Sequence, residues 1–200
     1  MRATEVMPPE YLELAEERAS TCWLPHKQPE EFGYDFRTWV SPYTKGAYKY
    51  GGLAFVLQDW ASADGLGGTI NPEIQRYGRT PALMTNVRLE HLLGRLLGLR
   101  LADVYVTNAF PFVKAGGMSA SLRDSDVRRA ARRFAVRELE LAKPRLVLAL
   151  GGVAYSALGH CGVSCIRLPH PAARIGSTAK HESAWRAALA SSGVAVPEPK

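Results

Sequence analysis

The sequence predicts an α/β fold, a three-layer α/β/α sandwich with a central, mostly parallel four-stranded sheet. Two observations support this prediction. Short runs that are apolar at every position and bounded by turn residues indicate strands buried on both faces, as in parallel sheets. These runs alternate with longer segments whose apolar residues recur at helical spacing. A repeated strand–helix order favours parallel connections within one sheet.

Length and composition bound the organisation of the chain. Its 200 residues predict one domain over 1–200, with an α/β core at 51–192 and an extension at 1–50 that holds a helix and many aromatic residues. The apolar fraction of 46% is enough for a buried core and excludes a disordered chain. The last residues, 194–200, are expected to fray.

Charge and cysteine content narrow the expected partners. A net charge of +6 favours a polyanionic partner such as DNA. Three cysteines do not make a disulfide scaffold, which favours the cytoplasm, and they are one too few for an all-cysteine zinc or iron–sulfur site. No apolar run reaches the ~18 residues of a membrane span, and the N-terminus lacks an apolar signal core. We expect a cytoplasmic monomer with no metal, no cofactor and no membrane contact.

The N-terminal extension is expected to be ordered. A helix is predicted over 8–19, where Pro9 suits the first turn. The segment 22–50 has no clear periodicity but is rich in tyrosine, tryptophan and phenylalanine. Such residues either pack to form structure or provide a platform on which nucleic-acid bases stack, and we favour packing.

Four strand–helix pairs follow this extension. The helices are placed by apolar stripes, by Gly98 as a C-terminal cap and by Pro144 as a terminator. The predicted strands are 53–57, 103–108, 145–150 and 163–168, and the helices that follow them are 85–97, 125–142, 152–158 and 179–190. Arginines line one face of helix 125–142, and we favour a solvated basic face there over a track for DNA.

Polar or glycine residues follow each predicted strand. Gln58 and Asp59 follow the first, Asn108 the second, the glycine pair 151–152 the third, and His170 comes after the fourth. Each has a simple structural explanation, such as a helix cap or a turn. Parallel strands, however, bring all their carboxyl ends to one edge of the sheet, where open α/β sheets bind ligands. A carboxylate, an amide and an imidazole converging there predict a functional site.

Four short motifs carry a family resemblance. They are Leu57-Gln58-Asp59-Trp60-Ala61, Val106-Thr107-Asn108, Leu150-Gly151-Gly152-Val153-Ala154 and Leu168-Pro169-His170-Pro171-Ala172. In type and order, over 51–177, they resemble the water-positioning, base-reading, phosphate-gripping and catalytic-histidine motifs of the uracil-DNA glycosylase superfamily. The resemblance is to a bacterial-type member without an iron–sulfur cluster, and it implies flipping of a uracil or related deaminated base out of DNA for excision.

The resemblance also implies roles for individual residues. The catalytic residues would be Asp59 and His170. The residues that contact the base would be Gln58, Asn108 and Trp60, and those that contact DNA would be Gly151, Gly152, Arg174 and Ile175.

The first motif departs from the family pattern. Leu57, Trp60 and Ala61 stand where the pattern has glycine, proline and tyrosine. That tyrosine excludes the methyl group of thymine, so selectivity for uracil over thymine is not implied here. Ala172 stands in place of the serine that follows His-Pro in the pattern.

The residue types fit base excision on chemical grounds as well. Breaking a glycosidic bond leaves positive charge on the sugar and negative charge on the base. A carboxylate stabilises the first and an imidazole N–H the second, while an amide can pair with the edge of a flipped base. Two alternatives stay open: a superfamily member that binds nucleic acid without cleaving it, and an α/β enzyme that binds a nucleotide or sugar phosphate at Gly151 and Gly152.

Overall fold

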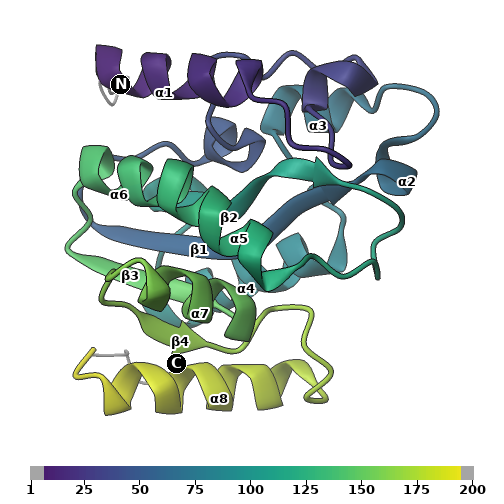
Figure 1. Cartoon of the computed structure of the whole chain (residues 1–200). Helices are drawn as coiled ribbons and strands as arrows, with labels where there is room; N and C mark the ends of the chain where they lie inside the picture. The colour runs from purple at the N-terminus through teal and green to yellow at the C-terminus, as the bar shows by residue number, and fades with distance from the viewer. Residues whose placement is uncertain (1–6, 195–200) are drawn as a thin grey trace, which may run out of the picture.

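A computed structural model of the chain describes residues 7–194 (Figure 1), so the predicted fraying of the tail falls almost entirely outside the described residues. Four strands form one sheet in the order β2-β1-β3-β4, and every neighbouring pair is parallel. The strands are β1 (Leu53–Ser62), β2 (Tyr105–Lys114), β3 (Leu146–Leu150) and β4 (Ile166–Leu168). The predicted α/β fold with a parallel four-stranded sheet is confirmed.

Helices connect the strands and cover both faces of the sheet (Figure 1). The α-helices are α1 (Pro9–Ser20), α2 (Ala63–Leu66), α3 (Pro72–Tyr77), α4 (Met84–Leu97), α5 (Asp124–Ala130), α6 (Val136–Ala142), α7 (Gly152–His160) and α8 (Thr178–Ser191). One π-helical turn, Ala131–Ala135, joins α5 to α6, so these form the single long helix that the sequence predicts. Three short 3-10 helices are η1 (Pro29–Phe32), η2 (Pro42–Gly46) and η3 (Leu101–Asp103).

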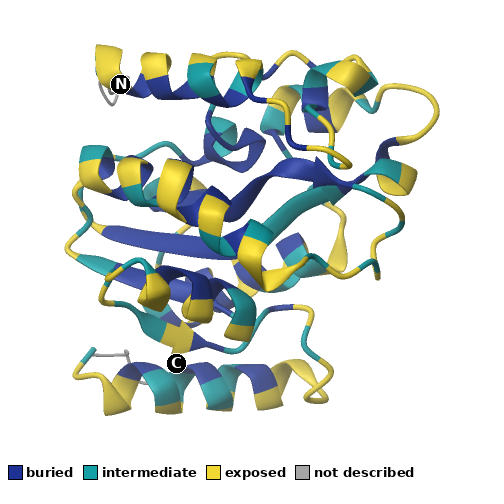
Figure 2. Cartoon of the chain, in the orientation of Figure 1, coloured by how far each residue is buried: buried dark blue, intermediate teal, exposed yellow. Residues whose placement is uncertain are grey.

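Alternate residues of β1 enter two hydrophobic cores, one on each face of the sheet. Ala54 and Val56 pack on the side of α1, α5, α6 and α7. Phe55 and Leu57 pack on the side of α4 and α8, where Trp185 stacks on Phe55 with ring centroids 6.1 Å apart. Figure 2 shows β2, β3 and the first half of β1 largely buried between helices whose outer faces are exposed. Burial on both faces explains why these strands are apolar at consecutive positions.

Two strands are longer than the sequence predicts. β1 continues past Asp59 to Ser62, and β2 continues past Asn108 to Lys114. The ladder between them also continues, with a shift of register after Asp59. The prediction that Asp59 and Asn108 mark strand ends is therefore wrong. Backbone groups make the ladder, so a polar side chain need not end a strand whose neighbours stay buried.

The N-terminal extension packs onto the sheet. Its buried residues include Tyr34, Phe36 and Tyr43. Arg18 of α1 is fully buried and donates hydrogen bonds to the carbonyl oxygens of Phe36, at 2.6 Å, and Trp39, at 3.0 Å. These contacts favour a structural role for the aromatic segment, and they bring Tyr43 beside the strands.

The part of the chain that the structure describes contains neither a membrane span nor a metal-binding cluster. Between residues 7 and 194, no helix combines the length and apolarity needed to span a bilayer. Within the same range, no three histidine, cysteine, aspartate or glutamate side chains come together as a metal site would require. The three cysteines, Cys22, Cys161 and Cys165, are free thiols.

Candidate active site

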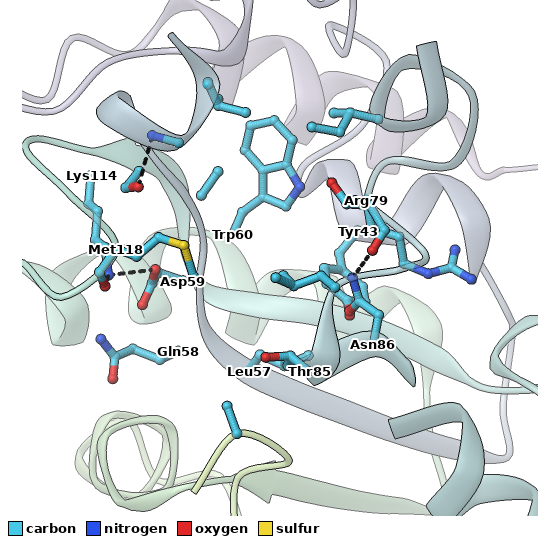
Figure 3. Close-up of a pocket in the computed structure, with 18 of the residues that line it drawn as sticks. Tyr43, Leu57, Gln58, Asp59, Trp60, Arg79, Thr85, Asn86, Lys114 and Met118 are labelled. Carbon is cyan, nitrogen blue, oxygen red and sulfur yellow. Dashed lines mark hydrogen bonds and ion pairs between the residues drawn. The ribbon is translucent and has the colours of Figure 1, made fainter. Parts of the chain in front are cut away.

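A cavity of about 440 Å³ opens beside the C-terminal half of β1. Its walls come from β1, the segment from α2 to the start of α4, the end of β2 and the loop after β4. The lining includes Gln58, Asp59, Trp60 and His170, four of the residues that the sequence singles out. Figure 3 shows the side chains of Gln58, Asp59 and Trp60 around this space.

Asp59 forms an ion pair at the wall of the cavity. Its carboxylate Oδ2 lies 3.2 Å from Nζ of Lys114, the last residue of β2 (Figure 3). The side chains are 17% and 8% exposed, so water screens this pair less than a surface pair. Lys114 Nζ also donates a hydrogen bond of 2.7 Å to the carbonyl oxygen of Met118. The carboxylate and the amine are therefore held together at the place where a ligand would enter.

His170 reaches the same cavity from the loop after β4. Its Nδ1 accepts a hydrogen bond of 3.1 Å from the backbone N–H of Ala172, so the neutral ring carries its proton on Nε2. Burial lowers the pKa of His170; the Asp59 carboxylate opposes this shift, and His181 adds to it. The ring is thus held neutral at pH 7, with one N–H left free to donate.

Two side chains of the α4–α8 layer hold the histidine loop. Trp185 Nε1 donates a 2.8 Å hydrogen bond to the carbonyl oxygen of Pro169. Arg88 donates one of 2.6 Å to the carbonyl oxygen of Pro171 and also contacts His181 Nε2 at 3.1 Å. The carbonyls on both sides of His170 are fixed by the core helices, which limits the motion of the imidazole.

Trp60 forms part of the cavity wall and is anchored behind it. Its Nε1 donates a 2.7 Å hydrogen bond to the carbonyl oxygen of Gly78, and its ring meets Phe36 edge-on, with centroids 5.6 Å apart. Gly78 in turn has φ of 70°, and a Cβ there would lie 1.7 Å from the carbonyl oxygen of Pro42. No other residue fits this contact, so the wall depends on a glycine after α3.

Two asparagines differ in their access to the cavity. Asn108, the base reader that the resemblance implies, is not among the cavity-lining residues; it is buried, with its Oδ1 accepting a 2.6 Å hydrogen bond from Ser41. Its Nδ2 has no partner within hydrogen-bond distance. Asn86, in the first turn of α4, does line the cavity, where its Oδ1 accepts from Tyr43 and its Nδ2 donates to the carbonyl oxygen of Thr80.

The four residues expected to contact DNA lie outside the cavity lining. Gly151 follows β3 with φ of 94°, and its N–H donates to the carbonyl oxygen of Leu168 at 2.8 Å. A Cβ on Gly151 would lie 3.3 Å from that of His170. Gly152 begins α7 and is exposed. Arg174 and Ile175 are exposed on the loop after His170.

Arginines of α5, α6 and the π-helical turn between them contact other side chains of the protein. Glu17 of α1 forms ion pairs with Arg133, at 2.7 Å, and Arg137, at 2.5 Å. Arg129 lies over the ring of Trp23, 4.8 Å from its centroid, and Arg128 contacts His160. These arginines of the basic face therefore make contacts with neighbouring helices.

Several residues of the site were missed in the sequence. The prediction omits Lys114 because it places the end of the second strand at Asn108. The apolar residues Phe112 and Val113 indicate that the strand continues. Asn86 and Tyr43 carry no local signal, since their place at the cavity depends on how α4 and η2 pack on the sheet. Arg88 likewise reaches the histidine loop from 83 residues away in the chain.

Comparisons with known proteins place this architecture in a family. A search of curated proteins returns no match. A family model described as the uracil DNA glycosylase superfamily matches residues 66–190, which is more than half of the chain. The matched range contains Asn108 and His170 but begins after Asp59. The chain therefore belongs to the uracil DNA glycosylase superfamily.

Proposed function

We propose that this protein is a DNA base-excision glycosylase that hydrolyses the N-glycosidic bond of uracil or a related deaminated base. The observation that carries the proposal is the convergence of Asp59 from β1 and His170 from the loop after β4 on one cavity. Membership of the superfamily supports a glycosylase-like function in general. The assignment of residues and substrate rests on the chemistry of the cavity.

Asp59 and His170 suit the two charges that form as the bond breaks. The Asp59 carboxylate would stabilise the positive sugar and orient the attacking water. His170, neutral at pH 7, would donate its Nε2–H to the oxygen of the departing base and stabilise the negative charge there. A donor that is already aimed needs little reorganisation during the reaction, and such donors lower the barrier by about 3 kcal/mol.

Recognition of the base is assigned to amides. Gln58 and Asn86 line the cavity, while Asn108 has an unpartnered Nδ2 but is buried against Ser41. The superfamily resemblance favours Asn108, which would require the hydrogen bond from Ser41 to open as the base enters. Comparing Asn86→Ala with Asn108→Ala distinguishes these possibilities. Only the variant that lacks the base-reading amide should show both a lower rate of base release and weaker discrimination between bases.

The decisive test of the function is release of free base. Duplex and single-stranded oligonucleotides that carry uracil, hypoxanthine, xanthine or a G·T mismatch would be incubated with the protein and scored for abasic sites. Release of a deaminated base by the wild type and its loss in Asp59→Asn support the proposal. Binding without release by any of these substrates would instead support the second candidate, a nucleic-acid-binding member that does not cleave.

One observation favours that second candidate: Asp59 is already neutralised by Lys114 at 3.2 Å. A carboxylate held in this way has less charge to offer a developing cation. The third possibility, a nucleotide or sugar-phosphate enzyme, has less support, because Gly151 packs against His170 and lies outside the cavity lining. Binding of DNA that weakens as salt is raised would separate the DNA-binding candidates from a small-molecule enzyme, since neutralised phosphates release counterions.

A further inference from the structure

The residue that base excision leaves unexplained is Lys114. Its side chain is 8% exposed, yet it lines the cavity with its Nζ beside the candidate catalytic carboxylate. Among the cavity-lining residues it has the only primary amine. A lysine needed for charge alone would gain nothing from a position this enclosed, because desolvating an ammonium group costs free energy. Its position suits a group that acts on whatever occupies the cavity.

We propose that Lys114 reacts with the sugar that remains after a base is lost, and so gives this site an abasic-site lyase activity. The proposal rests on DNA entering the cavity as proposed above. Excision leaves a hemiacetal at the sugar carbon C1′, which opens to an aldehyde. Lysine amines form Schiff bases with carbonyl groups when an adjacent group takes their proton.

Lys114 would cleave the strand through an imine followed by β-elimination. The Lys114 ammonium passes a proton to Asp59, 3.2 Å away, and the free amine adds to the C1′ aldehyde. Asp59 returns its proton to the hydroxyl of the adduct, which leaves as water, and the adduct becomes a protonated imine. The imine acidifies C2′; the Asp59 carboxylate takes that proton, the electron pair forms the C2′=C3′ bond, and the 3′ phosphate leaves. Water then hydrolyses the imine and returns the free lysine with an unsaturated aldehyde on the 5′ fragment.

The geometry supplies two further requirements of this chemistry. The ammonium is held by the carbonyl oxygen of Met118, at 2.7 Å, as well as by Asp59, so the amine has a defined place at the cavity wall. Lys114 and Asp59 also lie on adjacent parallel strands (Figure 3). An Asp59 carboxylate placed at the sugar carbon during excision would therefore leave Lys114 within reach of the same carbon afterwards.

The test starts from DNA whose base has already been removed, so that it does not depend on glycosylase activity. Wild-type protein would be mixed with a duplex carrying an aldehydic abasic site, and sodium borohydride would be added to reduce any imine. A duplex with a tetrahydrofuran abasic analogue, which has no aldehyde, is the matched substrate control. We expect a covalent protein–DNA adduct only with the aldehyde and borohydride, and strand cleavage 3′ to the site without borohydride.

Mapping identifies the lysine that reacts. Peptide mass spectrometry of the wild-type adduct should place the reduced sugar on Lys114. Lys114→Arg keeps the charge but cannot form an imine, and it should reduce adduct formation to background. Lys143 follows α6, precedes the start of β3 and lies outside the cavity lining, so Lys143→Arg should leave the yield unchanged. An adduct absent from the wild type, or mapped to another lysine, overturns the proposal even if Lys114→Arg fails to fold.

The borohydride experiment and the base-release assay together keep the two proposals distinct. An adduct on the abasic duplex together with no release of any base would refute the glycosylase and support the lyase. Base release together with no adduct would support the glycosylase and refute the lyase.

Discussion

Replacing Asp59 by asparagine should impair both the stability and the activity of the protein, for separate reasons. The substitution removes the negative partner of Lys114, which is 8% exposed and keeps only the Met118 carbonyl oxygen as an acceptor among the described contacts. Leaving a largely buried charged donor under-satisfied costs about 1–3 kcal/mol. Loss of a carboxylate that acts on the transition state should slow base release by on the order of a hundredfold or more.

A double substitution separates these two effects. Lys114→Met removes the charge that Asp59→Asn leaves behind, so the double variant should regain much of the lost stability while base release stays low. Urea unfolding followed by tryptophan fluorescence gives the free energy of unfolding, and single-turnover assays give the rate. The coupling between the two sites should again be about 1–3 kcal/mol.

The result that would refute this reasoning is a double variant that recovers base release along with stability. Asp59 would then act only to neutralise Lys114. Asp64, an exposed carboxylate in α2 outside the cavity lining, provides the matched control. Asp64→Asn should leave both stability and rate near their wild-type values. If Asp64→Asn abolished base release and Asp59→Asn did not, the catalytic carboxylate has been assigned to the wrong residue.

Three more predictions follow from single residues. His170→Ala should lower single-turnover base release by about a hundredfold, equivalent to roughly 3 kcal/mol, with little change in melting temperature; a lower melting temperature at an unchanged rate would indicate a structural turn. Burial raises the pKa of Glu138 to about 8, so the folded state holds its proton more tightly than the unfolded chain, and stability should fall as pH rises from about 4.5 to 8, by at most about 1.4 kcal/mol per pH unit. Urea unfolding across that range should show this slope in the wild type and a flatter one in Glu138→Gln. Gly78→Ala should lower the free energy of unfolding by more than about 1 kcal/mol, because the added Cβ would lie 1.7 Å from the Pro42 carbonyl oxygen. A melting temperature equal to that of the wild type would contradict the close contact.

Much of the fold could be predicted because it depends on local patterns. The helix over Met84–Leu97 ends where Gly98 adopts φ of 64°, as expected for a glycine cap. Parallel pairing follows from strands that are apolar on both faces. The ends of β1 and β2 were placed too early, because polar side chains at Asp59 and Asn108 were taken as the limits of strands whose backbone pairing continues.

The site was predicted only in part, for a physical reason. Asp59 and His170 could be found because parallel strands share an edge and both residues lie near it. The access of Asn108 to the cavity could not be predicted, since its burial depends on Ser41, which lies 67 residues away in the chain. Asn86 of α4 and Tyr43 of η2 complete the cavity because distant segments pack together, and a local sequence pattern cannot predict such packing.

The order of the strands gives Gly151 a significance apart from phosphate binding. β3 lies between β1 and β4, so the histidine that follows β4 must pass over the end of the intervening strand to approach the carboxylate of β1. Gly151 stands at this crossing, and its lack of a side chain provides the clearance for the imidazole to pass. A methyl group there would lie 3.3 Å from the Cβ of His170 and would push the ring outward by a few tenths of an ångström, at a backbone φ of 94° that already disfavours a side chain. The approach of the loop after β4 to β1 therefore requires a residue without a side chain at position 151.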